Sequence, residues 1–280
     1  AVRAARPDAD PTVSTPSLVW VRARPAGRSL LSLLLVMAFA LSVLAVAGEP
    51  VAGSGGAKAA REVLASLLRP DLSLPFLRTV AEATLLTAAY AVAAMTVALA
   101  VGIPGALAVS GVLVRRRSAR LASVSVVRGL FATVRAIHEL VWALLLLIIL
   151  GPNPIAGVIA IGLPYGATVA RVLGERLTDV PAAPLAALTS AGSSPWQTLF
   201  YGRLPLAGAD LAGYLFYRFE CAVRAAAVLS FIGLGGIGFQ IQIALADLRF
   251  ERVWPLLAAL LVLVVAVDRL SRYVREAGTV

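Results

Sequence analysis

The chain lacks most of what a soluble, disulfide-linked or metal-binding protein would need. Charged side chains make up 14% of its 280 residues, whereas a soluble domain carries about 25%. A single cysteine, Cys221, permits no internal disulfide, and a single histidine, His138, has no metal-ligating partners. No G-x-x-x-x-G-K-[ST] pattern occurs, so the sequence offers no P-loop for ATP. These shortages exclude a cytosolic enzyme, a disordered tail and a disulfide scaffold.

What the chain has instead is apolar sequence, because 60% of its side chains are hydrophobic and the mean hydropathy is +0.89. Six long apolar runs predict an all-α, polytopic membrane protein with about six transmembrane helices. The runs are 29–47, 79–113, about 121–150, 155–173, about 206–232 and about 253–267. We expect Gly102, Pro104 and Gly105 to bend or end the second run, which is too long for one straight span.

The first run has a rival interpretation as a signal peptide, because Ala45-Val46-Ala47 resembles a cleavage site. Its apolar stretch is nevertheless longer than the ~7–15 residues of a signal-peptide core. We therefore expect an uncleaved first span. The predicted organisation is an N-terminal tail, 1–28, followed by a transmembrane domain, 29–280, with its core at 79–275.

The formal net charge of +10 predicts the orientation of these spans. In a soluble protein such an excess would indicate a nucleic-acid partner, but here most of it lies between apolar runs, so no such partner is expected. Of the 25 basic residues, 15 lie in segments on the side of the N-terminus, six on the other side and four inside runs. The positive-inside rule then predicts that both termini are cytoplasmic and that the long 174–205 loop is too.

Charges within the third and fifth runs are the first candidate functional residues. Arg135 and Glu139 are four residues apart, as are Glu220 and Arg224, so each pair would share a helix face. Arg218 has no carboxylate four residues away and is the favoured free cation. Two interpretations stay open: local neutralisation, or a cationic path for an anionic substrate, since the guanidinium group suits phosphonate-like oxyanions. We expect His138 to be a neutral, hydrogen-bonded core histidine.

The 174–205 loop is too long to be a simple connection. Its apolar side chains and the break at Gly192-Ser193-Ser194-Pro195 predict two short amphipathic helices joined by a bend and lying along the membrane surface. The apolar side chains concerned are Leu185, Leu188, Trp196, Leu199 and Phe200.

This loop resembles the coupling loop of ABC importer permeases. In that family Glu-Ala-Ala is followed after three residues by Gly and after nine more by a hydrophobic residue, any residue and Leu-Pro. Here Ala186-Ala187-Leu188 is followed by Gly192 and then by Gly202-Arg203-Leu204-Pro205. The resemblance implies that the loop docks on a separate ATPase, with these contact residues: Ala186, Ala187, Gly192, Ser193, Trp196, Leu204 and Pro205.

Two positions depart from the pattern. Ala186 stands where the family has Glu, and Gly202 stands where it has an aliphatic residue. The loss of the Glu implies either weaker coupling to the ATPase or a second, different permease that keeps the motif. A homodimer and a heterodimer are therefore both open.

The strings RAIHELVWALLL and YRFECAVRAAAVLSFIGLGGIG are similar to the permeases of phosphonate and phosphite ABC importers, in which a proline stands at the position of His138. The resemblance covers about 120–245. It implies the type I importer permease fold, a multi-pass inner-membrane location, and a substrate path along Arg135, Glu139, Arg218, Glu220 and Arg224.

The same resemblance implies uptake of a phosphorus oxyanion by alternating access. The expected partners are a second permease copy or paralogue, two cytoplasmic ATPases, an external binding protein and the lipid bilayer. ATP and Mg belong on the ATPases, so this chain would be no enzyme and would carry no cofactor or metal. The alternatives are a methionine-type or other organic-solute ABC permease and, from a different class, an ion-coupled secondary transporter with protonatable Glu139, Glu220 and His138.

The run Gly233-Leu234-Gly235-Gly236-Ile237-Gly238 matches the dinucleotide pattern G-x-G-x-x-G. No strand precedes it and apolar runs flank it, so a nucleotide site does not fit. We expect an unwound or tightly packed segment at the outer end of the fifth span, where Gly233, Gly235, Gly236 and Gly238 would permit the bending of a gate.

Overall fold

The computed structural model describes residues 25–46, 56–114 and 117–277. Helices account for all the regular structure of these residues, which confirms the all-α prediction. The chain divides into two units, Ala1–Ala59 and Ala60–Val280. The first holds α1 (Pro25–Val46), which covers most of the first expected span, and the start of α2 (Gly56–Ser66). Most of the predicted tail, 1–28, lies outside the described residues.

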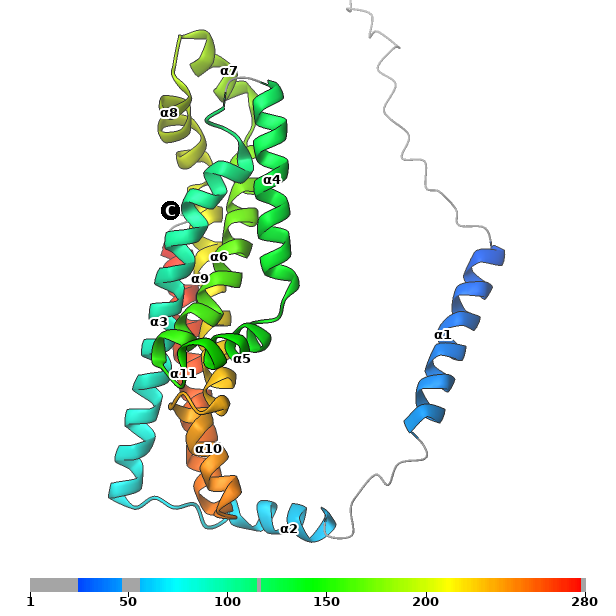
Figure 1. Ribbon diagram of the computed structural model, residues 1–280, viewed down its shortest axis with the longest axis vertical. Coiled ribbons are helices and arrows are strands. Elements are labelled where there is room, and N and C mark those ends of the chain that lie inside the picture. The colour runs from blue at the N-terminus through cyan, green and yellow to red at the C-terminus, as the bar shows by residue number, and fades with distance from the viewer. Residues whose placement is uncertain (1–24, 47–55, 115–116, 278–280) are drawn as a thin grey trace, which may run out of the picture. The chain divides into compact units, whose positions relative to one another are not determined.

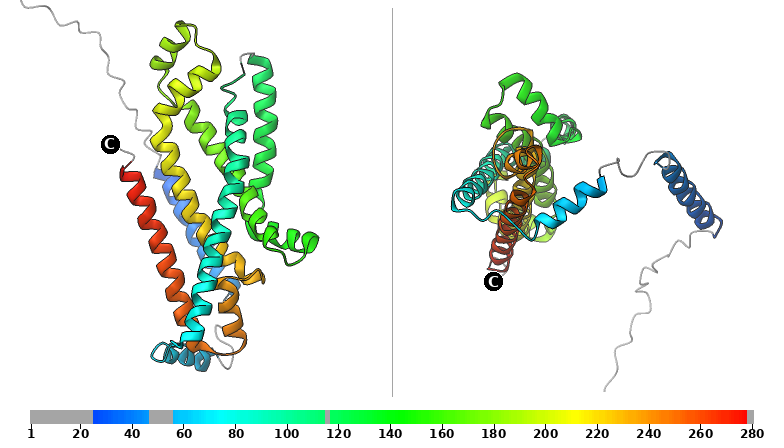
Figure 2. Two further views of the ribbon diagram at one scale, coloured as in Figure 1. Left: turned by 90° about the vertical axis from the view of Figure 1, so that its left-hand side faces the viewer. Right: turned by 90° about the horizontal axis from the view of Figure 1, so that it is seen from below.

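The second unit is a helical bundle. Within it α3, α6, α9 and α11 run along one another, α7 and α8 lie at one end, and α10 lies at the other (Figures 1 and 2). Its long helices are α3 (Leu74–Ser110), α4 (Arg117–Ala136), α5 (Glu139–Leu150), α6 (Pro154–Thr178), α9 (Leu204–Leu229) and α11 (Phe250–Ala277). Short elements are α7 (Ala182–Ser190), α8 (Pro195–Thr198), the π-helical η1 (Leu199–Arg203), the 3-10 turn η2 (Ser230–Ile232) and α10 (Ile237–Ala246).

Small residues set the closest packing in this unit, between α3 and α6. A Cβ added at Gly162 would lie 2.8 Å from the Cβ of Val97 and 2.9 Å from the carbonyl oxygen of Ala94. One added at Gly102 would lie 2.6 Å from a methyl group of Val169. Small residues let membrane helices approach closely where lipid supplies no hydrophobic driving force. The two helices therefore form the rigid centre against which the other elements pack.

The second run does not end at Gly102, Pro104 or Gly105, which was one of the two expected outcomes. Helix α3 passes through Pro104 and ends only at Gly111, whose φ of 60° places it in the left-handed region. Flanking Gly105 packs against Ala170 of α6 and Phe131 of α4, where an added Cβ would lie 2.7 Å from each. Membrane helices tolerate an internal proline where neighbouring helices help to satisfy the backbone groups that the proline frees.

The third run breaks where one helix was expected. Helices α4 and α5 meet at 85° around Ile137-His138. His138 is the N-cap of α5, and its Nδ1 accepts a hydrogen bond from Leu140 N at 3.2 Å. Trp142 Nε1 donates to the carbonyl of Val134 at 3.2 Å and so pairs one of the carbonyls that the end of α4 exposes. His138 is hydrogen-bonded as expected, but its side chain is 64% exposed, so its placement in the core was wrong.

The described residues account for four or five of the roughly six expected spans. Four helices of the described chain are long and apolar enough to cross a membrane, and the bent α4–α5 pair makes five if it counts as one span. In α1 the structure describes an apolar stretch at Leu30–Ala45, which is shorter than each of these four helices. The run expected at 155–173 extends to Thr178, so the first five residues assigned to the 174–205 loop belong to α6.

The segment before α3 is fixed to the start of α11. Asp71 N donates to the carbonyl of Glu251 at 2.9 Å, and Arg252 Nε donates to the Asp71 carboxylate at 3.1 Å. The hydroxyl and backbone N–H of Ser73, followed by Arg252, hold the pKa of Asp71 below its usual range. Trp254 Nε1 adds a hydrogen bond to the carbonyl of Val63 in α2 at 3.1 Å.

This arrangement predicts a pH dependence. A carboxyl group with a lowered pKa stabilises the fold above its unfolded value of 3.8, and that contribution disappears as the pH falls through the folded value. Asp71→Asn is therefore expected to lower the melting temperature of the purified chain at pH 7, with the difference from the wild type shrinking as the pH falls below 3.8. Thermal unfolding in detergent from pH 7 to pH 3 measures this. Asp179→Asn at the end of α6 is the control, and an equal loss in both variants would contradict the prediction.

Candidate functional site

A cavity of about 320 Å³ lies beside the break between α4 and α5. Its walls come from the start of α5, from α6 and from α9. They include two of the charged residues expected on a substrate path, Glu139 and Arg224, together with His138, Tyr165 and Cys221. The cavity is thus large enough for a small solute and presents groups of both charges.

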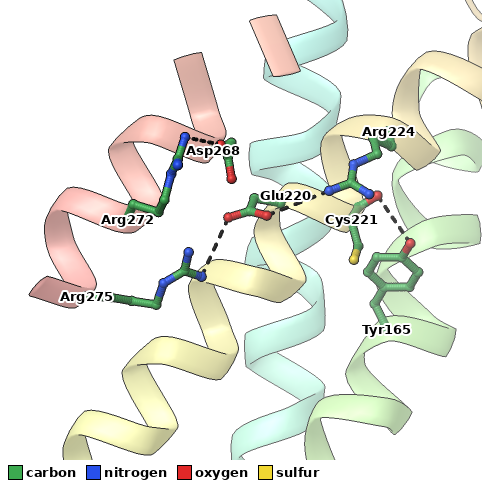
Figure 3. Close-up of polar contacts among 7 residues, drawn as sticks. All are labelled: Tyr165, Glu220, Cys221, Arg224, Asp268, Arg272 and Arg275. Atoms are coloured by element: carbon green, nitrogen blue, oxygen red, sulfur yellow. Dashed lines mark hydrogen bonds and ion pairs between the residues drawn. The ribbon is translucent and has the colours of Figure 1, made fainter. Parts of the chain in front are cut away.

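The Arg224 guanidinium belongs to a charge cluster centred on Glu220 (Figure 3). One carboxylate oxygen of Glu220 lies 3.7 Å from Arg224 and the other lies 3.7 Å from Arg275 of α11. The Glu220 side chain is only 9% exposed, whereas that of Arg224 is 57% exposed. The expected i,i+4 pair therefore forms, and it leaves most of the Arg224 side chain accessible beside the cavity.

The third member of this cluster, Arg275, was missed at the sequence level and counted only toward orientation. Nothing local could have revealed it, because Arg275 lies 55 residues after Glu220. Helix α11 brings it there by packing against α9, and its side chain also lies 3.6 Å from the Cβ position of Gly213. Asp268 and Arg272 form a separate pair at 2.6 Å on the same helix.

Arg218 forms no ion pair within the described part of the chain, as expected of a free cation, but it is not among the residues that line this cavity. Its guanidinium carbon lies 4.0 Å from the centre of the Tyr165 ring, a cation–π geometry. Its Nε is buried and has no hydrogen-bond partner within the described part of the chain. Tyr165 in turn donates its hydroxyl to the carbonyl of Cys221 at 3.3 Å. Arg218 thus lies behind a ring that faces the cavity rather than among the residues that line it.

The expected Arg135–Glu139 pair is wrong. Helix α4 ends at Ala136 and α5 begins at Glu139, so the two residues do not share a helix and the i,i+4 argument fails. Arg135 Nε donates to the carbonyl of Phe131 at 3.3 Å, and the Glu139 carboxylate lies 3.6 Å from His138 Nε2. Arg135 lines a second cavity, apart from Glu139.

The segment expected to contact an ATPase forms a compact turn at one end of the bundle (Figure 1). Gly192 has a φ of 85° and makes the bend after α7, and the Ser193 hydroxyl lies 2.9 Å from that of Thr198. Ala186, Ala187 and Trp196 are exposed there. The second expected helix is not separate, because α8 continues through η1 into α9, which begins at Leu204-Pro205.

The structure also explains the departure at Gly202. A Cβ there would lie 2.9 Å from methyl groups of both Leu185 and Leu188 of α7. An aliphatic side chain at 202 would therefore require these two leucine side chains to move. The glycine and these two leucines form one packing arrangement.

The glycine-rich segment is unwound as expected. After α9 and η2, Gly233, Gly235 and Gly236 have φ values of 91°, 82° and 89°, in the region that favours glycine. Ser230 Oγ accepts a hydrogen bond from Gly238 N at 2.8 Å, and Thr87 Oγ1 accepts one from Ile237 N at 3.0 Å.

Two partners of this turn, Thr87 and Tyr90 of α3, were not anticipated. The Tyr90 hydroxyl donates to the carbonyl of Leu234 at 2.6 Å. The sequence carries no distinct signal for them, because the same run also holds Glu82, Thr84 and Thr96.

Residues 102–277 match the family described as "Binding-protein-dependent transport system inner membrane component". The chain belongs to this family. It is 30% identical over 189 residues to the phosphate-import permease protein PhnE of Mycolicibacterium smegmatis, covering 68% of this chain and 36% of that protein. It is also 30% identical over 177 residues to the phosphite transport system permease protein PtxC of Stutzerimonas stutzeri, covering 63% and 64%. The chain thus spans less than two thirds of each relative.

Solved structures agree on the fold. The MetNI methionine ABC transporter, in a structure titled as inward facing, superposes with a TM-score of 0.63 at 18% identity, covering 74% of this chain and 99% of that one. An amino acid ABC transporter with histidines gives 0.61 at 20% identity, covering 73% and 96%. The chain therefore has the type I importer permease fold expected from its sequence.

Proposed function

We propose that this chain is the membrane-spanning permease subunit of an ATP-driven importer for phosphonate, phosphite or a related phosphorus oxyanion. The observation that carries the proposal is the 30% identity to proteins named as phosphate-import and phosphite transport permeases. The structure adds a cavity of about 320 Å³ with a largely accessible arginine, Arg224, on its wall. A guanidinium group binds two oxygens of such an anion at once.

In this proposal the exposed face of α7 and α8 contacts a cytoplasmic ATPase, and both chain termini lie on the cytoplasmic side. ATP and Mg act on that ATPase and not on this chain. Because η1 joins α8 to α9 without a break, a movement of the docking segment reaches Glu220, Arg224 and the glycine-rich turn along one continuous helical path. A second permease completes the path, and an external protein delivers the ligand. The two conformations must bind the ligand differently for the cycle to transport it.

Reconstitution tests the transport class. The chain is purified with its partner subunits, placed in liposomes, and uptake of radiolabelled phosphite is followed with and without ATP. Uptake that needs ATP and the ATPase supports the proposal. Uptake driven by an ion gradient with no ATPase present would instead establish a secondary transporter. ATP-driven uptake of methionine but not of phosphite would show that the chain is an organic-solute permease.

The subunit composition of the same preparation decides between a homodimer and a heterodimer. The alanine at 186 removes the carboxylate usual in the motif, so a paralogous permease that keeps it would make a heterodimer. Two copies of this permease and no other would exclude that arrangement. Mass spectrometry of the intact complex provides the measurement.

Arg224→Gln is expected to lower phosphite uptake about tenfold or more, since a hydrogen bond to a charged group contributes about 1.5–3 kcal/mol. Arg218→Lys removes the guanidinium group that stacks on Tyr165 but keeps the positive charge. We expect a smaller loss of uptake than for Arg224→Gln, because Arg218 does not line the cavity. Initial rates at equal expression give the comparison. Arg78→Gln, at an exposed position of α3, is the control, and unchanged uptake in Arg224→Gln would remove Arg224 from the path.

A further inference from the structure

A second cavity, of about 250 Å³, lies between α3, α4 and α6 in the half of the bundle nearer α7. Three arginines line it, Arg128 and Arg135 of α4 and Arg171 of α6, with a single acidic residue, Glu175. Its described lining residues therefore carry an excess of two positive charges. Arg128 and Arg135 are seven residues apart and so lie on one face of α4.

The single carboxylate is already engaged. Arg171 Nε lies 2.8 Å from Glu175 in an i,i+4 pair. Arg128 forms no hydrogen bond or ion pair with any residue that the structure describes, and Arg135 uses only its Nε, toward the Phe131 carbonyl. Two cationic groups thus share a cavity with no counter-charge of their own. Arg128 is exposed and Arg135 is half-buried, so both can reach an anion from solution, which would offset their mutual repulsion.

Close packing surrounds this cavity. Phe131 packs against Gly105 of α3, where an added Cβ would lie 2.7 Å from its ring, and this contact holds α4 on the α3–α6 pair. The volume is several times the ~30 Å³ that one water occupies in the liquid, so a tetrahedral anion fits. Each guanidinium group is planar and can donate hydrogen bonds to two oxygens of such an anion at once.

We propose that the cavity formed by Arg128, Arg135 and Arg171 is a phosphorus-oxyanion site, distinct from the cavity at Arg224. The ligand is either the phosphate of an anionic lipid headgroup or a free phosphate-type anion, and the two share the same chemistry. The site goes beyond the transport role proposed above and does not depend on it, because it concerns binding by this chain alone.

The test measures binding to the purified full-length chain without ATP or partner subunits. In one arm the chain is placed in nanodiscs of zwitterionic phosphatidylcholine and binding of ³²P-labelled inorganic phosphate is measured at constant ionic strength. In the other, native mass spectrometry measures retention of phosphatidylglycerol after extraction. The wild type is compared with R128Q/R135Q and with the charge-preserving R128K/R135K. The control is R78Q, at an exposed position of α3.

The wild type is expected to bind at least one probe and R128Q/R135Q to bind it about tenfold or more weakly, with R128K/R135K in between and R78Q unchanged. The arm in which the loss occurs identifies the source of the phosphate. Binding of neither probe by the wild type, equal binding by R128Q/R135Q, or an equal loss in R78Q overturns the proposal. If the glutamine variant fails to fold, by elution profile and melting temperature, then R128K/R135K decides: unchanged binding of both probes overturns the proposal. Because no transport is measured, these outcomes are independent of the liposome test.

Discussion

Replacing Gly238 by alanine is expected to destabilise the chain severely. A Cβ at this position would meet the Ala227 carbonyl and the Ser230 hydroxyl closer than real Cβ atoms come, and the Phe231 ring at 2.7 Å. One of these contacts is with backbone, which cannot rotate away as the end of a side chain does. The shift would also break the hydrogen bond from Gly238 N to Ser230 Oγ. Overpacking alone costs about 1–3 kcal/mol, and the lost hydrogen bond adds about 1 kcal/mol.

The measurement is the melting temperature of the detergent-purified chain, followed by fluorescence-detected size exclusion. Gly208→Ala in α9 is the matched control, because nothing lies within 4 Å of its Cβ position and alanine favours the helix by about 1 kcal/mol. We expect Gly208→Ala to melt at or above the wild-type temperature and Gly238→Ala well below it. A wild-type melting temperature for Gly238→Ala would show that the turn after α9 is loosely packed, contrary to the structure.

Replacing Glu220 by glutamine is expected to have the second large effect. The substitution keeps the shape of the side chain but leaves Arg224 and Arg275 without their shared carboxylate. Removing one member of a buried ion pair costs about 3–5 kcal/mol. The two arginines are 57% and 34% exposed, so solvent screening reduces the expected loss to about 1–3 kcal/mol. The loss should appear as a melting temperature lower by several degrees.

Asp268→Asn is the control for this substitution. It removes the carboxylate of an exposed i,i+4 pair with Arg272 on α11, and such pairs contribute at most about 0.5 kcal/mol. The double variant Glu220→Gln/Arg275→Gln should lose less than the sum of the two single variants, since each removes the same interaction. Strict additivity would contradict the cross-helix contact between α9 and α11.

The helical class, the bend at Gly192 and the unwound glycine-rich segment were predictable because each depends on residues close together in the sequence. Left-handed backbone at Gly233, Gly235 and Gly236 follows from the tolerance of glycine for positive φ. The Glu220–Arg224 pair follows from the four-residue repeat of a helix that continues unbroken. These features need no knowledge of what packs against them.

The same four-residue argument failed at Arg135 and Glu139 because it assumed a continuous helix. The N-cap at His138 and the Trp142 contact with Val134 stabilise the break. This chain has His138 there and no proline of its own to mark the break, whereas the resemblance to phosphonate permeases implies a proline at this position, which disfavours helix around it. At Pro104 the helix does not end, and α4 and α6 pack closely against the flanking Gly102 and Gly105.

The sequence by itself determined that the chain is helical, that it is apolar enough to enter a membrane, and which carboxylate pairs with Arg224. Tertiary structure alone decided that Arg275 joins Glu220, that Arg218 stacks on Tyr165, and that Arg128, Arg135 and Arg171 face one cavity. The reason is physical. Periodicity fixes which residues share one helix face, whereas charges on different helices meet only where close packing of small residues sets the distance between those helices.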